Sequence, residues 1–217
     1  MGQRKFIAIA GNIGTGKSSL LEFLTSTYDV APFYEPNEAN PYLADFYADM
    51  KRWAFQSQMF FLSNKFRMHQ EADRRRGVVV LDRTIYEDAE VFATALYRMR
   101  KIDRRDWETY WDFYQTLVRA IQPPDLMIYL RCPMRVLRRR IRMRGRGMEQ
   151  DIPLSYLKRL DRLYEEWFGR YTLGEVLVLK SDRLDFVHDL VDRQDVRSRV
   201  EALLPASLCR TRRRQSV

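Results

Sequence analysis

The sequence predicts a three-layer α/β fold in which a parallel five-stranded sheet lies between helices. Short apolar runs typical of buried parallel strands alternate with segments of helical periodicity along the 217-residue chain. The segment 11–18 matches G-x-x-x-x-G-K-S, a glycine-rich phosphate-binding pattern that joins a strand to a helix. Because no internal repeat or flexible linker interrupts the alternation, we expect one domain at 1–205, followed by a disordered basic tail at 206–217.

The phosphate-binding segment 11–18 has the flanks that its motif requires. The apolar run at 6–10 precedes it as a predicted strand, and leucines at helical spacing follow it over 18–26. Its glycines allow backbone N–H groups to face an anion, and the following helix adds the positive end of its dipole. We expect Lys17 to reach the outer phosphates of a nucleotide and the Ser18 hydroxyl to hold Mg²⁺.

The next elements follow from local patterns in chain order. The run at 30–34 is a predicted strand, and Asn40 before Pro41 signals the start of a helix that continues through Tyr47. Apolar residues at helical spacing predict a long helix over 52–76. The all-apolar run at 78–81 is typical of a central parallel strand, and a helix is expected over 85–100.

Acidic residues stand at the ends of two of these strands. Glu35 follows the strand at 30–34, and Asp82 follows the strand at 78–81. In an open α/β sheet, the carboxyl ends of the strands face the ligand crevice. Both residues are therefore candidates for a catalytic site, although Glu35 could be a solvated strand end and Asp82 could cap a helix.

An aromatic stripe marks the helix that Asp103 starts. It consists of Trp107, Tyr110, Trp111, Tyr114, Leu117, Val118 and Ile121. Such a stripe is usually a packing surface, so we expect core or a subunit interface. The stripe is more apolar than one solvent-facing helix can carry, which favours a homodimer. The remaining predicted elements are strands at 126–130 and 175–179 and helices at 135–144, 154–168 and 187–204.

The positive charge of the chain is clustered. The net charge is +9, with seven arginines between Arg135 and Arg146 and four between Arg210 and Arg214. Such a balance can indicate nucleic-acid binding. A charge run is more often a solvated helix face, but the break at Gly145 and the phosphate-binding segment favour an arginine-rich lid at about 135–152.

Composition argues against several other classes of protein. No apolar run approaches the roughly 18 residues of a membrane helix, and the first residues lead directly into a strand without room for a signal peptide. Two cysteines, Cys132 and Cys209, provide neither a disulfide framework nor metal-ligand spacing. We expect a cytoplasmic protein with no membrane partner and no specific nucleic-acid partner.

An ordered set of short motifs extends from about Lys5 to Leu204. It comprises Gly11-Asn12-Ile13-Gly14…Lys17-Ser18, Glu35-Pro36, Trp53…Gln58, Asp82-Arg83-Thr84-Ile85-Tyr86-Glu87-Asp88, Arg140…Arg144-Gly145-Arg146 and Glu149-Gln150…Ile152-Pro153-Leu154…Tyr156. This set resembles the deoxyribonucleoside kinase family, most of all its bacterial deoxyadenosine and deoxyguanosine kinases. The resemblance implies a P-loop kinase fold with an arginine-rich lid. It also implies Mg²⁺- and ATP-dependent phosphorylation of a deoxynucleoside 5′-hydroxyl in nucleotide salvage.

The resemblance also implies roles for individual residues. In catalysis, Glu35 takes the proton from the 5′-hydroxyl, Arg83 contacts that hydroxyl and the transferring phosphoryl group, and Asp82 lies near Mg²⁺. Tyr47 and Glu149 bind the 3′-hydroxyl of the substrate. Gln58, Asp88 and Phe92 contact its base. ATP contacts fall to Gly11, Asn12, Ile13, Gly14, Thr15, Gly16, Lys17, Ser18, Arg140, Arg144, Arg146, Asp185 and Phe186.

Base preference follows from the chemistry of Asp88. An ionised carboxylate only accepts hydrogen bonds, so it favours bases that carry amino groups and disfavours thymine. We expect purine deoxynucleosides, with deoxycytidine accepted and thymidine excluded. The resemblance implies the order of the purines, deoxyadenosine ahead of deoxyguanosine. Lys65 stands where some relatives have arginine, and it either supplies a charge to Asp88 or lies in solvent.

Two other functions remain open at this point. A nucleoside monophosphate kinase of the thymidylate type would need no general base and would place an arginine near Glu35. A basic P-loop NTPase that binds nucleic acid or acts as a switch would need a glutamine after the strand at 78–81, where Arg83 and Thr84 stand.

Overall fold

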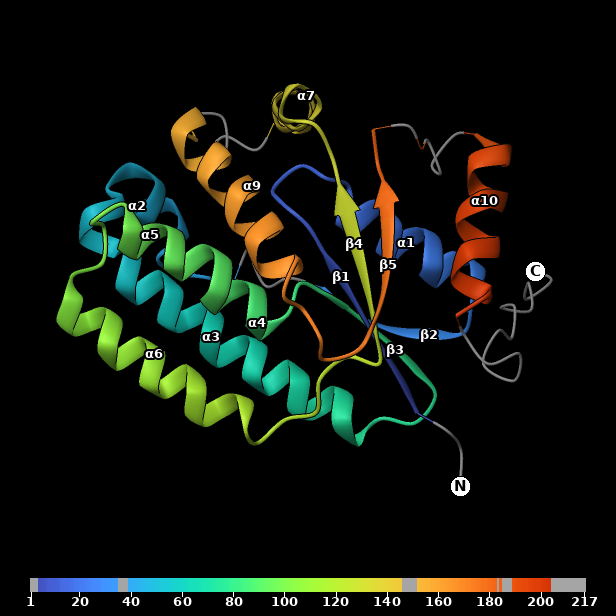
Figure 1. The fold of residues 1–217 in the computed structure, drawn as a ribbon, viewed down its shortest axis with the longest axis horizontal. Coiled ribbons are helices and arrows are strands. Elements are labelled where there is room, and N and C mark those ends of the chain that lie inside the picture. The colour runs from blue at the N-terminus through green and yellow to red at the C-terminus, as the bar shows by residue number, and fades with distance from the viewer. Residues whose placement is uncertain (1–3, 35–38, 146–151, 183, 185–188, 204–217) are drawn as a thin grey trace.

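The computed structural model describes residues 4–34, 39–145, 152–182, 184 and 189–203. Its strands form one parallel sheet in the order β2-β3-β1-β4-β5 (Figure 1). The strands are β1 (Lys5–Ala10), β2 (Val30–Phe33), β3 (Val78–Asp82), β4 (Leu126–Arg131) and β5 (Glu175–Lys180). The predicted five-stranded parallel sheet is therefore confirmed.

The connections between the strands are helical, as predicted. The helices are α1 (Lys17–Thr27), α2 (Leu43–Ala48), α3 (Met50–Arg74), α4 (Ile85–Glu87), the π-helix η1 (Asp88–Ala93), α5 (Thr94–Arg98), α6 (Arg104–Val118), α7 (Met134–Arg144), α9 (Leu154–Phe168) and α10 (Leu190–Glu201). Within the described residues, no helix has the length and apolar character needed to cross a membrane.

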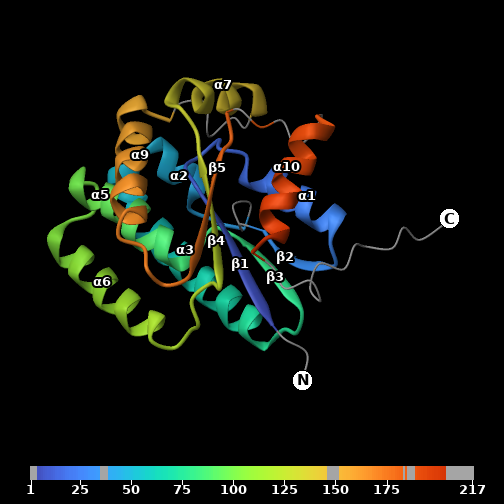
Figure 2. The same ribbon diagram turned by 45° about the vertical axis from the view of Figure 1, so that its right-hand side comes forward.

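Side chains alternate between the two faces of the sheet and create a core on each side. Ile7 and Ile9 of β1 pack in a cluster with residues of α1 and α10, whereas Ala8 and Ala10 pack with residues of α3, α6 and α9. Figure 2 shows these two groups of helices on opposite sides of the sheet. This two-residue period is what a strand buried on both faces requires.

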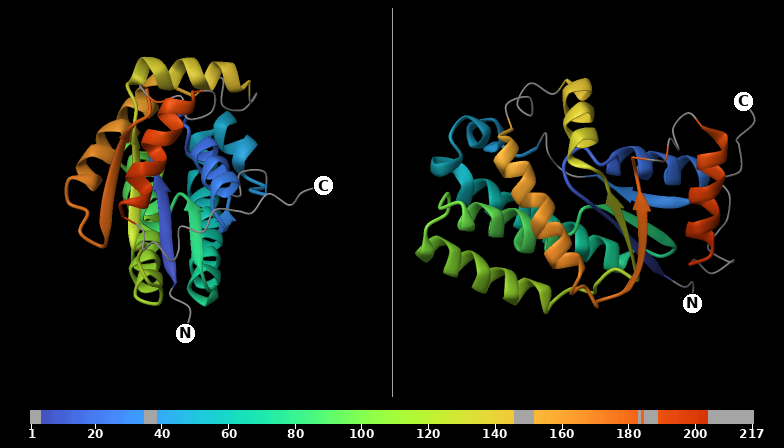
Figure 3. Two further views of the ribbon diagram at one scale, coloured as in Figure 1. Left: turned by 90° about the vertical axis from the view of Figure 1, so that its right-hand side faces the viewer. Right: turned by 45° about the horizontal axis from the view of Figure 1, so that its top comes forward.

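The parallel arrangement brings the carboxyl ends of the strands to one edge of the sheet. Segment 11–18 follows β1 there, and Asp82 ends β3 at the same edge. The basic helix α7 lies across this edge (Figure 3). The fold therefore collects the residues that were expected to bind phosphate and metal.

Helix boundaries differ from the predictions where side chains bind the backbone. Helix α2 begins at Leu43 rather than beside Pro41, because the Asn40 Oδ1 accepts a hydrogen bond from the Tyr42 N–H at 2.9 Å and forms a turn first. Helix α10 begins at Leu190, because the Asp189 side chain accepts hydrogen bonds from the next turn.

The predicted helix over 85–100 is not a regular α-helix. Its middle, η1, is a π-helical segment in which the Thr94 backbone N–H and hydroxyl both donate to the Ala89 carbonyl, five residues earlier. π-Helical segments are often found at functional sites. Asp88 and Phe92, both expected to surround the base, belong to this segment and are buried.

Most aromatic residues of the α6 stripe pack against other residues of the same chain. Tyr110 and Tyr114 are buried, and Trp107 stacks on Tyr97 of α5 with ring centroids 4.8 Å apart. Trp111 is half-buried. The core interpretation is thus confirmed for the two tyrosines.

The start of α6 offers a test of the fold. The Asp103 Oδ1 accepts a hydrogen bond from the Asp106 N–H at 2.9 Å, so Asp103→Ala should lower the free energy of unfolding by about 1 kcal/mol. The control is Asp112→Ala, an exposed position on the same helix, where alanine should leave stability unchanged or slightly raised. Urea unfolding monitored by circular dichroism measures both, and equal effects would contradict the capping role.

Candidate functional site

The loop between β1 and α1 has a shape that only glycine permits at its first position. Gly11 has φ +148°, and a Cβ there would lie 2.8 Å from both the Leu130 carbonyl oxygen and the Thr15 Oγ1. Gly14 and Gly16 also adopt positive φ values. The loop therefore turns tightly against the end of β4 before α1 begins at Lys17.

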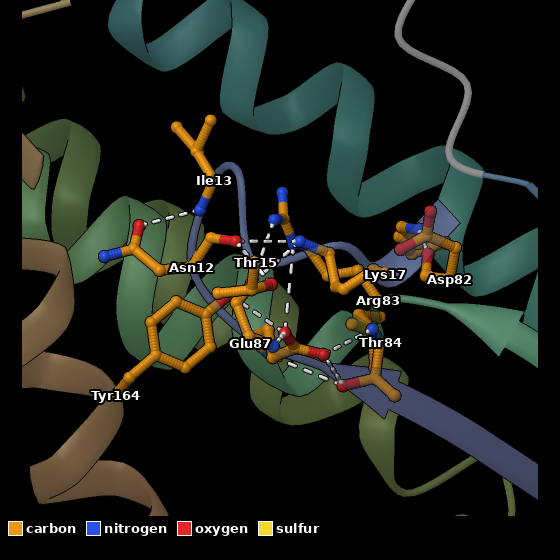
Figure 4. A network of polar contacts seen from close by, with 12 residues as sticks. Asn12, Ile13, Thr15, Lys17, Asp82, Arg83, Thr84, Glu87 and Tyr164 are labelled. Carbon is orange, nitrogen blue, oxygen red and sulfur yellow. Dashed lines mark hydrogen bonds and ion pairs between the residues drawn. The ribbon is translucent and has the colours of Figure 1, made fainter. Parts of the chain in front are cut away.

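Two side chains of the loop hold its backbone in place (Figure 4). The buried Lys17 Nζ donates to the carbonyl oxygens of Gly11 at 2.8 Å and Asn12 at 3.1 Å. The Asn12 Oδ1 accepts from the Ile13 N–H at 2.8 Å, and its Nδ2 donates to the Leu157 carbonyl of α9 at 3.2 Å. Asn12 thus fastens the loop to α9.

Ser18 and Asp82 meet as the expected metal site requires. The Ser18 hydroxyl donates to the Asp82 Oδ2 at 3.1 Å, and Asp82 is buried. The Asp82 Oδ1 is buried with no hydrogen-bond partner among the described residues. One hydroxyl and one carboxylate with a spare oxygen fit Mg²⁺, which keeps several waters and takes its other ligands from phosphates.

Lys65 is buried next to the backbone of Asp82 and does not lie in solvent. It is fully buried, and its Nζ donates to the Asp82 backbone carbonyl at 2.5 Å. The solvent interpretation of Lys65 is therefore wrong. Amphipathic periodicity placed Lys65 on the Gln58 face of α3, but it could not show that this face covers the end of β3.

Arg83 has a strained backbone and a confined side chain. Its φ is +65°, which is rare for a residue other than glycine and costs about 1–3 kcal/mol. The guanidinium donates to the Gly11 carbonyl at 3.3 Å, and its Cζ lies 4.2 Å from the centre of the Phe92 ring. Arg83 is 6% exposed, so a cation is held directly beside the P-loop.

Glu87 is a functional candidate that sequence reasoning did not single out. Its side chain is fully buried, and its Oε1 accepts from the Tyr164 hydroxyl at 2.9 Å and the Gly11 N–H at 3.3 Å. Its Oε2 accepts from the Thr84 N–H at 3.0 Å, and Oε1 lies 3.8 Å from the Arg83 Nε. Two signals in the sequence could have identified it: Glu87 belongs to the motif at 82–88, and the spacing Thr84-x-x-Glu87 matches a capping box.

Burial and charge act in opposite directions on Glu87. Burial raises the pKa of its carboxyl group above the ordinary value, and the positive charges of Arg83 and Lys17 offset only part of this increase. Glu87 is therefore close enough to both cations to interact with them electrostatically.

The expected substrate residues gather around a tyrosine of α9. Burial raises the pKa of Tyr156 well above its ordinary value, and Tyr47, Arg83 and Asp88 act on it electrostatically. Asp88 is 3% exposed, so its surroundings are largely closed to water. Residues of α2, η1 and α9 and the residue after β3 are thus close enough to interact electrostatically.

Gln58 is a buried polar residue of α3. It is 3% exposed, and its Oε1 has no hydrogen-bond partner among the described residues. A buried amide oxygen without a partner is costly unless a ligand supplies the donor. Gln58 therefore has the character expected of a residue that contacts a base.

The lid arginines are described only in part. The Arg140 guanidinium donates to the Thr15 carbonyl at 3.0 Å and to the Ser181 carbonyl at 2.7 Å, so it lies against the P-loop. Arg144 is exposed at the end of α7. Five expected site residues lie outside the described part of the chain: Glu35, Arg146, Glu149, Asp185 and Phe186.

The chain is similar in sequence and in fold to known proteins. The family model for deoxynucleoside kinases matches residues 7–205. A deoxyadenosine/deoxycytidine kinase of Bacillus subtilis is 32% identical over 189 residues, covering 86% of this chain and 87% of the relative. A deoxyguanosine kinase of Lactobacillus johnsonii is 34% identical over 207 residues, covering 91% of this chain and 92% of the relative. The structure of a deoxyadenosine kinase from M. mycoides with bound dCTP superposes with a TM-score of 0.78 at 28% identity, covering 91% of this chain and 99% of that one.

Substitution of Gly11 tests the geometry of the loop. Gly11→Ala adds a Cβ in a space occupied by Leu130 and Thr15, so it should lower both the free energy of unfolding and the affinity for ATP. The control is Gly77→Ala, which has φ +83° but no atom within 4 Å of the added Cβ, and should lose only about 1–2 kcal/mol. Urea unfolding and calorimetric ATP titration measure both variants. Undiminished ATP affinity in Gly11→Ala would contradict the tight-turn requirement.

Proposed function

The chain belongs to the deoxynucleoside kinase family and is an enzyme that phosphorylates deoxynucleosides, and we propose that it transfers the γ-phosphoryl group of ATP to the 5′-hydroxyl of purine deoxynucleosides. We expect a higher kcat/KM for deoxyadenosine than for deoxyguanosine. The reaction would serve nucleotide salvage. The observation that carries the proposal is that the Arg83 guanidinium contacts both the Gly11 carbonyl of the P-loop and the ring of Phe92, a residue expected beside the base.

On the donor side, the P-loop provides backbone N–H groups for the phosphates of ATP. Lys17, held by carbonyl oxygens of its own loop, is positioned to exchange those partners for phosphate oxygens. Ser18 and Asp82 would hold Mg²⁺, which neutralises charge on the transferring phosphoryl group. The lid arginines Arg140, Arg144 and Arg146 would close over the same phosphates.

On the acceptor side, Glu35 would take the proton from the 5′-hydroxyl. Arg83 would stabilise the charge that develops on the phosphoryl group during transfer, because its guanidinium is already fixed beside the P-loop. Its buried setting strengthens this interaction relative to water. Tyr47 and Glu149 would bind the 3′-hydroxyl of the sugar.

The base would be bound by the buried polar groups of α3 and η1. The Gln58 amide can both donate and accept, and the ionised Asp88 carboxylate can only accept. Together they match the amino-bearing edge of a purine and leave thymine with an unfavourable contact. The relatives include kinases named for deoxyadenosine, deoxyguanosine and deoxycytidine, so the order of the purines follows from the resemblance of motifs alone.

The first test concerns the catalytic base. Glu35→Gln should lower kcat by about 10²–10⁴-fold, because the amide cannot accept the proton, while ATP binding stays intact. Glu22→Gln, the same change at an exposed position of α1, should leave kcat unaltered. Steady-state kinetics and calorimetric ATP titration measure both variants. Wild-type turnover in Glu35→Gln would remove the base role from Glu35.

A second test measures the acceptor. A coupled ATPase assay should give kcat/KM highest for deoxyadenosine, then deoxyguanosine and deoxycytidine, with no turnover of thymidine, deoxynucleoside monophosphates or DNA. Asp88→Ala should selectively weaken the use of amino-bearing bases and leave the affinity for ATP unchanged. Thymidine as the best substrate would exclude the role given to Asp88, and a monophosphate as the best acceptor would identify the alternative kinase class.

The third test concerns the oligomeric state of the protein. We propose a homodimer formed through α6, where Trp107 and Trp111 are half-buried and Phe113 is 41% exposed in the single chain. Multi-angle light scattering at micromolar concentration should give twice the mass of the chain, and Phe113→Glu should shift the mass toward that of a monomer. A wild-type monomer under these conditions would refute the proposal.

A further inference from the structure

Glu87 is a fully buried acidic residue that the mechanism above does not use. We propose that Glu87 is a positioning residue that orients the Arg83 guanidinium for phosphoryl transfer and ties it to the first residue of the P-loop. This inference rests on the proposed function of Arg83 and deepens it.

The contacts of Glu87 connect three parts of the site. Its Oε1 accepts hydrogen bonds from the Gly11 N–H of the P-loop and from the Tyr164 hydroxyl of α9, and it lies 3.8 Å from the Arg83 Nε. Figure 4 shows the Glu87 carboxylate with its hydrogen bonds to Thr84 and Tyr164. A movement of Glu87 would therefore change the position of Arg83 relative to the loop.

A structural role alone does not require a charge at this position. The capping box with Thr84 is satisfied by either glutamate or glutamine. A fully buried carboxylate is costly to desolvate, and it persists when charges and hydrogen bonds compensate it. The compensating charges here are Arg83 and Lys17, the two cations proposed to act on the phosphoryl group. Glutamine lacks the attraction for these cations, and its amide nitrogen also cannot accept the hydrogen bond that one carboxylate oxygen accepts from Gly11 or Thr84.

Arg83 needs such an external restraint. Its backbone is in the left-handed region, which persists only where the surroundings hold it. The guanidinium packs on the Phe92 ring and donates to the Gly11 carbonyl, and Glu87 approaches it from its Nε side. Loss of the carboxylate would leave one side of the guanidinium without its counter-charge, so the group could rotate away from the transfer path.

The test compares two identical substitutions one helical turn apart. Glu87→Gln keeps the side-chain shape and should lower kcat on the order of 10²-fold, with KM for the deoxynucleoside and Kd for ATP nearly unchanged. Glu90→Gln is the matched control, because Glu90 also pairs with an arginine, Arg170, and a tyrosine, Tyr114, but outside the site. It should retain wild-type kcat.

A double-mutant cycle separates positioning from general destabilisation. If Glu87 acts through Arg83, adding Glu87→Gln to Arg83→Ala should cause no further loss of kcat. An additive loss, or wild-type kcat in Glu87→Gln alone, would overturn the inference while leaving the proposed function of Arg83 intact. Unchanged turnover in Arg83→Ala alone would instead overturn that function, and the inference with it.

A milder variant keeps the test decisive if Glu87→Gln does not fold. Tyr164→Phe removes only the hydroxyl that donates to the Glu87 Oε1. It should lower kcat by several-fold without changing Kd for ATP, and this loss should also disappear in the Arg83→Ala background. Persistence of the loss in that background would overturn the inference.

Discussion

The parallel pairing of β1 with β3 is the constraint on which the site depends. Ile9 lies opposite Asp82 in this pairing, and the Arg83 N–H continues it by donating to the Ile9 carbonyl at 3.0 Å. Because both strands end at the same level, the P-loop and the segment after β3 leave the sheet side by side. The contacts of Ser18 with Asp82 and of Arg83 with Gly11 follow directly from this register.

The charges at this edge of the sheet balance one another before any nucleotide binds. Among the described residues with less than a tenth of their surface exposed, three are cations, Lys17, Lys65 and Arg83, and three are acids, Asp82, Glu87 and Asp88. The net charge of +9 therefore resides elsewhere, including the arginines of α7. Such a division lets the interior remain stable in the empty enzyme, while an approaching polyphosphate meets an excess of positive charge at the surface.

The sequence was sufficient to predict what depends on local pattern. The strands, most helices and the P-loop follow from periodicity and from one glycine-rich motif, because these features are encoded by neighbouring residues. The burial of Lys65 and the network of Glu87 were not predictable, because both depend on which helix covers the end of β3 and where Tyr164 of α9 lies. The roles of all the expected site residues, Glu35 and Glu149 among them, remain predictions.

The π-helical segment η1 also affects how this chain is compared with others. A π-helical turn contains one residue more than the α-helical turn it replaces. Since each residue of an α-helix turns by about 100°, removing one would rotate Asp88 and Phe92 to different faces relative to α5. An alignment with a relative whose helix is regular here therefore needs a one-residue gap between 88 and 94. Without that gap, residues on one side of the segment would be paired with the wrong counterparts.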